Sequence, residues 1–379
     1  MADPLQHLRR WSLDRQRLSR PDTDPLAVLR DVIGVYATQP AGPLALRARV
    51  PGLDMGRIRA LEQARHVMRV GGMRGTAHLV PSESAARVLA ATERPIASDA
   101  WRLRDAGIDQ PTYERWRDAI LRVAAAPIST RDLRARLRAE MPLGPVIQTM
   151  TLEGLLMDVA PASPRSAALL HVSVDAWLGR PRPKADPVSS LRWLVDGYLC
   201  AFGPARVEDI SWWIGGRHTA VGEAIAALDL VTLDGGLLLR REDVPTFEAG
   251  LPDGRGRVDV LAMWDIYTMG YRADGRARFV SPDTGDRLFD TDGNGLGAIL
   301  VDGLAVAAWT GRAVGHRFEV DLDPFERPSP RVESAMAEGF ADVARVLELA
   351  EVSIRLVEGP LGRRLRRRRP SPAEPTPSP

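Results

Sequence analysis

The sequence predicts an α+β fold in which three similar segments, each with helices followed by strands, precede a β-rich C-terminal region. Apolar residues first recur at helical spacing and then form strand-like runs, and this order is found three times along the chain. Beyond residue 255 the strand-like pattern dominates, with Asp-Gly turns at 292–293 and 302–303. The 379 residues are 45% apolar and 26% charged, which suffices for several hydrophobic cores.

The first segment is expected to span residues 12–90. Apolar spacing predicts three helices, followed by two strands on either side of Gly71 and Gly72. Because paired glycines accept the positive φ angles of a tight turn, these strands should form a hairpin. The expected helices lie at 24–37, 41–50 and 55–64, and the strands lie within 66–80.

The second segment, residues 108–182, repeats this order with three helices and a closing strand. Ser129 and Thr130 are good N-caps for the middle helix, because their hydroxyl groups accept hydrogen bonds from the first turn. The expected helices lie at 113–125, 129–140 and 145–159, and the strand lies within 168–178.

The third segment, residues 188–250, shows the order again. Gly203 and Pro204 predict the end of its first helix. Asp234 and Gly235 predict the turn of its closing hairpin. The expected helices lie at 189–202, 205–216 and 218–229, and the hairpin spans 230–243.

The C-terminal region, residues 255–357, is expected to be β-rich up to residue 320 and to close with a helix over 333–357. The tail, residues 358–379, has six arginines between Arg363 and Arg369, and then a run rich in Pro and Ser. Such a run buries too little apolar surface to fold, so we expect the tail to be disordered.

Composition excludes several classes of protein. The single cysteine, Cys200, excludes an internal disulfide, and six scattered histidines give no metal-ligand spacing, so we expect no metal site. There is no apolar run long enough for a membrane span or a signal peptide, which favours a cytoplasmic protein. Lys184 is the only lysine among 51 basic residues, but the net charge is +2, so any surface for nucleic acid must be local.

Three helices followed by a β-hairpin form the winged-helix version of the helix-turn-helix, which binds DNA. A single segment of this kind can also be a purely structural packing module. Three copies in tandem are more specific for DNA binding than one.

Several sequence blocks resemble the bacterial winged-helix DNA glycosylases of the AlkZ and YcaQ type, and the resemblance covers about residues 12–350. The blocks occur in the order expected for that family. They are R-x-R at 47–49, M-R-G-T-x-H-L-V-P at 73–81, G-P-A-x-V-x-D-I-x-W-W-x-G at 203–215, D-x-Y-x-x-G-Y-R at 265–272 and V-D-G-x-x-V-A-x-W at 301–309.

The resemblance implies three tandem winged helices and a β-rich domain, without a metal or organic cofactor. It implies a monomeric, nucleoid-associated enzyme that hydrolyses the N-glycosidic bond of bulky or crosslinked alkylated purines in damaged double-stranded DNA. Such an activity serves base excision repair or resistance to a genotoxin. The alternative is a catalytically silent DNA-binding protein, either a lesion binder or a transcription regulator.

The family's catalytic motif, Q-x-Q or Q-x-D, aligns with residues 34–40 in the first segment through the flanking Gly34 and Pro40, but the chain departs from it there. Tyr36 and Thr38 occupy the positions of the two catalytic side chains, and Gln39 follows them. Thr38 can hold a water molecule, and Tyr36 can donate to a leaving base or stack on a sugar. The bland alternative is that Tyr36 is a core aromatic and Thr38 an ordinary residue at a helix end.

The candidate DNA contacts lie in three places. Arg47 and Arg49 follow the motif, although they equally fit a solvated helix face. In the first hairpin, Gly75 permits a close approach to a phosphate. Arg74, Thr76 and His78 beside it are candidates too, although His78 equally fits a half-buried position. The third place is the tail, where the candidates are Arg363, Arg364, Arg366 and Arg367.

Overall fold

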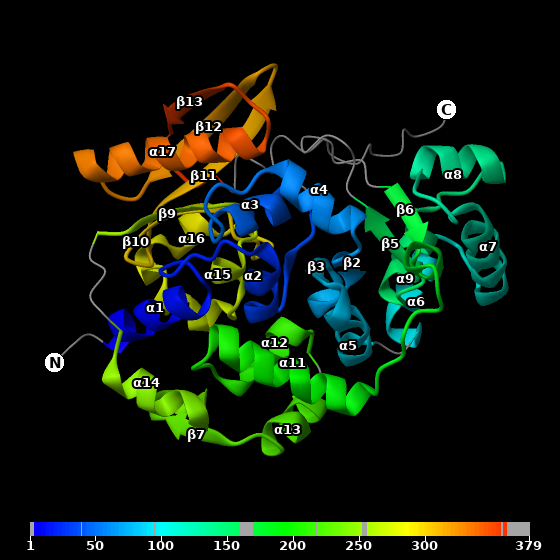
Figure 1. Ribbon diagram of the computed structural model, residues 1–379, viewed down its shortest axis with the longest axis horizontal. Helices are drawn as coiled ribbons and strands as arrows, with labels where there is room; N and C mark the ends of the chain where they lie inside the picture. The colour runs from blue at the N-terminus through cyan, green and yellow to red at the C-terminus, as the bar shows by residue number, and fades with distance from the viewer. Residues whose placement is uncertain are drawn as a thin grey trace, which may run out of the picture.

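The protein is a mixed α and β structure of several packed segments (Figure 1). The computed structural model describes residues 4–38, 40–93, 96–159, 170–216, 218–251, 256–357 and 359–361. Among the described helices, none has the length and apolar character needed to cross a lipid bilayer.

The first segment contains a short strand that the sequence did not predict. The helix expected at 24–37 ends at Asp31, and Val35–Tyr36 form β1. Gly34 turns the chain here with φ +87°, and a Cβ on it would lie 2.5 Å from the carbonyl oxygen of Leu79. The helix α1 (Pro4–Arg15) was not predicted either, and α2 (Pro25–Asp31) is the shortened first helix. The elements that fit the prediction are α3 (Ala41–Arg47), α4 (Met55–Gln63), β2 (Val67–Gly71) and β3 (Ala77–Pro81), and the strands form a sheet of order β1-β3-β2.

The second segment follows two linking helices and has its own hydrophobic core, centred on Tyr113, Ile120 and Met150. Its third predicted helix ends earlier than expected, at Leu152, because Gly154 has φ +65° and the chain continues as a strand. The elements are α5 (Ser82–Thr92), α6 (Ile96–Asp105), α7 (Gln110–Val123), β4 (Ile128–Ser129), α8 (Thr130–Leu137), α9 (Gly144–Leu152), β5 (Leu156–Val159), β6 (Leu170–Ser173) and α10 (Val174–Leu178), and the strands form a sheet of order β4-β6-β5.

The third segment follows the predicted order of helices and strands. Gly203 ends its long first helix, and the turn at Asp234–Gly236 joins its two strands. The elements are α11 (Pro187–Phe202), α12 (Val207–Ile214), α13 (His218–Ala226), β7 (Leu230–Leu233), β8 (Leu237–Arg240) and α14 (Val244–Ala249).

The C-terminal region departs from the prediction at two places. The expected run of strand is interrupted after Leu261, because the carboxylate of Asp265 accepts a hydrogen bond from the Tyr267 amide and caps a short helix. The expected closing helix ends at Val346, and Glu348, with φ +57°, redirects the chain into a strand. The elements are β9 (Val258–Leu261), α15 (Ile266–Met269), η4 (Ala273–Arg278), η5 (Pro282–Thr284), α16 (Gly285–Leu288), β10 (Gly297–Val301), β11 (Leu304–Val314), β12 (Arg317–Pro324), α17 (Pro330–Val346) and β13 (Glu351–Leu356).

The strands of this region form one sheet of order β13-β12-β11-β10-β9, in which only the β12–β13 pair is parallel. In Figure 1 the first segment lies between this sheet at the top and the helices α11–α14 below, with the second segment at the right. α3 packs against α17, α5 against α11, and β2 against β5. The first segment, the third segment and the C-terminal region thereby share one continuous core.

Candidate nucleic-acid site

The chain after β1 is held tightly against the first segment, and it carries an exposed threonine. The Ala37 amide donates to the Ala77 carbonyl oxygen at 2.9 Å, and the Gly42 amide donates to the Thr38 carbonyl oxygen at 3.1 Å. A Cβ on Gly42 would lie 2.6 Å from the Tyr36 carbonyl oxygen, so this close approach of α3 to β1 needs glycine. The Thr38 side chain is exposed at the end of this fixed backbone. Its hydroxyl group has no hydrogen-bond partner within the part of the chain that the structure describes.

The buried side chain of Arg69 holds the same backbone through a hydrogen bond. Arg69 is 1% exposed, its Nε donates to Glu62 Oε1 at 2.8 Å, and its Nη1 donates to the Ala37 carbonyl oxygen. The position of Thr38 is therefore fixed by the hydrogen bonds to Ala37 before it and by the bond from Gly42 of α3 to its own carbonyl oxygen.

Tyr36 is buried and pairs with Arg74 of the first hairpin, and Arg74 in turn contacts Trp212 of the third segment. The phenol is 5% exposed and its oxygen accepts a hydrogen bond from Arg74 Nη2. Arg74 has φ 54° in the turn between β2 and β3, which directs its side chain back over the sheet. Its guanidinium carbon lies 5.7 Å from the Tyr36 ring centroid and 4.2 Å from that of Trp212 on α12. Tyr36, Arg74 and Trp212 therefore form one stacked series, which we call the Arg74 stack.

Burial keeps both Tyr36, a member of this stack, and His78, which packs against it, in their neutral forms. It raises the pKa of the Tyr36 phenol, and the charge of Arg74 only partly opposes the rise. His78 packs on Tyr36 with ring centroids 4.7 Å apart. Its pKa is lowered to about 4, chiefly by burial and further by Arg74, against a hydrogen bond to the Thr76 carbonyl oxygen. His78 therefore supports the Tyr36 ring, and its 1% exposure does not fit the DNA contact expected from the sequence.

We expect His78 to make the protein less stable in acid. The folded-state pKa of about 4 is below the ordinary value of 6.5, so the unfolded chain takes up a proton first as the pH falls. The stability is complete above about pH 6.5 and is lost as the pH falls toward 4. The wild type should lose free energy of unfolding between pH 7 and pH 4.5, and in His78→Gln this loss should be smaller by about 2 to 3 kcal/mol. Urea unfolding at the two pH values measures it. Replacing the exposed His66 in the same way should leave the loss unchanged, and an equal effect of both variants would contradict this account.

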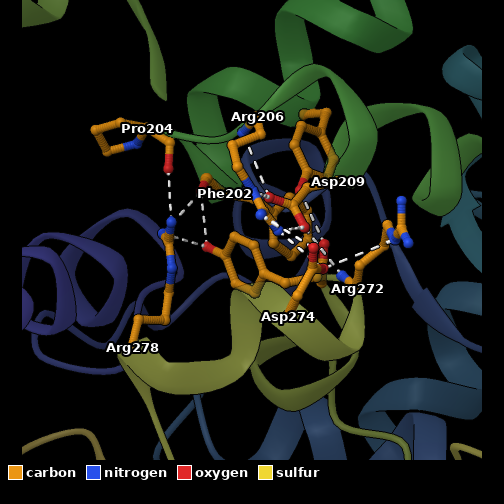
Figure 2. Close-up of polar contacts among 10 residues, drawn as sticks. Phe202, Pro204, Arg206, Asp209, Arg272, Asp274 and Arg278 are labelled. Carbon is orange, nitrogen blue, oxygen red and sulfur yellow. Dashed lines mark hydrogen bonds and ion pairs between the residues drawn. The ribbon is translucent and has the colours of Figure 1, made fainter. Parts of the chain in front are cut away.

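A network of ion pairs fixes α12, which carries Trp212, to η4 (Figure 2). Arg206 Nε donates to Asp209 Oδ2 at 3.0 Å, and its Nη2 donates to Asp274 Oδ1 at 3.0 Å. Asp209 is 1% exposed, and its other oxygen accepts from the Arg272 amide at 3.0 Å. The two carboxylates raise the pKa of Arg206, and Arg206 lowers the pKa of Asp274. Arg206 and Asp274 are thus both held in their charged forms, which suits a rigid joint.

Arg278 closes the same joint on its buried side (Figure 2). Its Nη2 donates to the Pro204 carbonyl oxygen at 2.8 Å, and its Nη1 donates to the Tyr271 hydroxyl group at 3.0 Å. The Tyr271 hydroxyl group in turn donates to the Phe202 carbonyl oxygen at 2.6 Å. The joint holds the start of α12 against η4, so Trp212 meets Arg74 in a fixed position.

Arg47 and Arg49 correct the expectation of phosphate contacts. Arg49 and Asp265 are both fully buried, and they form a two-pronged ion pair with N–O distances of 2.9 and 2.8 Å. Arg47 donates to the carbonyl oxygens of Val260 and Gly339, and burial lowers its pKa. Both side chains join α3 and the residues after it to the C-terminal region, so neither fits the phosphate contact expected from the sequence.

The remaining candidates are divided between the surface and residues outside the described ranges. Thr76 is exposed, and Gly75 and Arg74 are half-buried at the turn between β2 and β3. Gln39 lies outside the described residues, and so do Arg363, Arg364, Arg366 and Arg367 of the tail. The structure therefore brings Tyr36, Thr38 and the hairpin turn together on one segment.

Two residues of this region were not identified from the sequence. Trp212 is half-buried against Arg74, and the charge of Arg74 contributes to the lowered pKa of Arg276 of η4. Their partners are far away along the chain, and composition gives no signal for such a meeting. Among the described residues, no group of three or more His, Cys, Asp or Glu side chains is placed to hold a metal ion.

Comparison with known proteins gives two findings. Residues 29–346 match the family model described as DNA glycosylase AlkZ-like. The fold is similar to that of the Streptomyces sahachiroi DNA glycosylase AlkZ, with a TM-score of 0.74 and 19% identity, over 94% of this chain and 100% of that chain. No curated protein matches the sequence.

Proposed function

Because the chain belongs to the AlkZ-like DNA glycosylase family, we propose that it hydrolyses the N-glycosidic bond of bulky or crosslinked alkylated purines in double-stranded DNA. The observation that carries this proposal is the exposed Thr38 on a fixed backbone beside the Arg74 stack. Repair of such lesions, or resistance to the genotoxin that makes them, would be its use in the cell.

Thr38 is the side chain best placed to act in the reaction. Loss of an alkylated purine leaves a cationic sugar, which a water molecule then captures. The Thr38 hydroxyl group is free to accept from and donate to that water. The backbone of Ala37 and the carbonyl oxygen of Thr38 are held by hydrogen bonds, so little ordering of this backbone is needed when substrate binds.

Tyr36 and Arg74 have supporting roles in this proposal. The Tyr36 phenol is neutral and its oxygen is already paired with Arg74, so it orients Arg74 and does not serve as a base. Arg74 is half-buried, carries a positive charge and stands at a hairpin turn, which suits contact with a backbone phosphate. Gly75 and Thr76 at the same turn let the DNA approach the main chain closely.

We extend the proposal to the architecture of the DNA-binding surface. The segments 12–90, 108–182 and 188–250 each act as a winged helix, and the region 255–357 supports them. One chain binds one damaged duplex as a monomer. The repeated order of helices and paired strands along the chain supports this assignment.

A catalytically silent lesion binder is the second candidate. Tyr36 and Thr38 stand where the family has glutamine or aspartate, and the buried Tyr36 offers no carbonyl or carboxylate oxygen to a water molecule. Such a protein would bind damaged duplex through the same surface without releasing a base.

An excision assay distinguishes the two candidates. The full chain is incubated with a duplex containing one N7-alkylguanine, and abasic sites are detected by alkaline cleavage, with the duplex alone as the control for spontaneous depurination. We expect abasic sites to form faster with the protein than without it. An unchanged rate together with tight binding to the damaged duplex would favour the silent binder.

The arginine-rich tail should add affinity without specificity. Removing residues 363–379 takes away six arginines, and each phosphate contact contributes about 0.9 to the slope of log K against log salt concentration. The slope should therefore become shallower by up to several units for damaged and undamaged duplex alike. Titrations at several salt concentrations measure it, and an unchanged slope would show that the tail does not contact DNA.

A further inference from the structure

A pocket of about 520 Å³ lies between η4, η5 and α16, next to the joint shown in Figure 2. Val280, Pro282 and Phe289 give it apolar walls, and Ser281 lies at its side. Arg276 also lines the pocket.

Arg276 is a buried cation without a matching anion. Its side chain is stacked on Phe289, with the guanidinium carbon 3.5 Å from the ring centroid, and the residue is 9% exposed. Nη2 donates to the Gly293 carbonyl oxygen at 3.2 Å, while Nε has no partner. Within the described ranges no carboxylate forms an ion pair with it. A buried guanidinium in this state is costly unless a ligand supplies acceptors.

The carboxylates around the pocket are mostly committed elsewhere. Asp274 is paired with Arg206 at 3.0 Å, and Asp290 accepts from the amides of Asp292 and Asn294, both at 2.9 Å. Asp286 is exposed and is the one lining carboxylate, among the described residues, that has no such partner.

Arg276 of the pocket is linked electrostatically to Arg74 of the candidate site. The pKa of Arg276 is lowered to about 10, first by burial and then by the charge of Arg74. An anion bound at Arg276 would offset the repulsion between these two positive charges.

We propose that this pocket binds a backbone phosphate of the DNA strand, with Arg276 as its ligand and the apolar walls against the adjoining deoxyribose. A phosphate oxygen in the pocket accepts from the Arg276 guanidinium group, and a charge-assisted hydrogen bond of this kind is short and strong. The inference rests on the proposed DNA binding and does not depend on catalysis.

The test measures binding of the full chain to duplexes in which a neutral methylphosphonate replaces one phosphate at a time. For the wild type, at least one replacement should weaken binding by about tenfold to a hundredfold, as expected for loss of a charged hydrogen bond. In Arg276→Gln the same replacement should have little effect, because the ligand of that phosphate is gone. Arg276→Lys should retain part of the effect. Arg355→Gln, which removes one positive charge from β13, should behave as the wild type.

A second variant keeps the test valid if Arg276→Gln folds poorly. Asp286→Asn removes an exposed negative charge from the pocket, so it should strengthen binding several-fold with the native phosphate and not with the methylphosphonate. An identical methylphosphonate pattern in the wild type and Arg276→Gln would overturn the proposal, as would an equal gain from Asp286→Asn on both duplexes.

Inorganic phosphate provides the remaining arm of the experiment. If it raises the melting temperature of the wild type but not of Arg276→Gln, while both proteins show the same methylphosphonate pattern, the pocket takes free phosphate and the proposal is overturned. Because binding is measured, a protein that excises nothing can still show the contact, and an active glycosylase can lack it. Failure of this inference is therefore distinguishable from failure of the proposed function.

Discussion

Replacing Thr38 with alanine is expected to lower the single-turnover rate of base excision by about tenfold to a thousandfold. The hydroxyl group stands at the family's second catalytic position, and its loss removes one interaction with the water that captures the cationic sugar. Thr38 is exposed, so the variant should keep the stability of the wild type. Its affinity for damaged duplex should change little, because the Arg74 stack is untouched.

Thr38→Ser is the matched control, since it keeps the hydroxyl group and loses only a methyl group. It should retain most of the excision rate. Equal rates for the wild type and Thr38→Ala would remove Thr38 from the mechanism, and equal losses in both variants would indicate that packing of the methyl group matters instead.

Breaking the ion pair between Arg49 and Asp265 should have the largest effect on stability. Both side chains are fully buried, so Arg49→Ala leaves a carboxylate without its partner in the protein interior. The free energy of unfolding should fall by about 3 to 5 kcal/mol, the usual cost of an uncompensated buried charge. Denaturant unfolding monitored by tryptophan fluorescence measures this loss.

An exposed ion pair with similar geometry provides the control. Arg355 and Asp321 are 2.7 Å apart, but the Arg355 side chain is 64% exposed, so water already stabilises both charges. Arg355→Ala should cost less than about 1 kcal/mol. Similar losses for Arg49→Ala and Arg355→Ala would contradict a structural role for Arg49.

The sequence predicted best the elements that have a local signal. Periodic apolar residues identified α3, α4 and α11 to α13. Gly71 and Gly72 identified a hairpin, but its turn lies a little later, at Met73–Gly75, because Gly71 ends β2 and Arg74 and Gly75 have the positive φ angles. A strand of two residues such as β1 has no periodicity, so the residues before Tyr36 were predicted as helix. The strand β13 was also missed, because its apolar residues continue the pattern of α17.

The candidate site was only partly predictable for a related reason. The resemblance placed Tyr36 and Thr38, and the hairpin pattern placed Arg74. Whether an arginine faces water or a buried carboxylate depends on a residue far along the chain, as Arg49 and Asp265 show. Trp212 and Arg276 meet Arg74 only through the joint around Asp209, which no local pattern indicates.

The central claim is that the chain after β1 forms the working site of a glycosylase. The most direct test compares the single-turnover excision of N7-alkylguanine by the wild type and by the variant Tyr36→Gln, Thr38→Asp, which restores the family's Q-x-D pattern. We predict that the wild type releases the base faster than spontaneous depurination, and that the variant is at least as fast. An inert wild type beside an active variant would contradict the claim and identify the natural protein as a silent DNA binder.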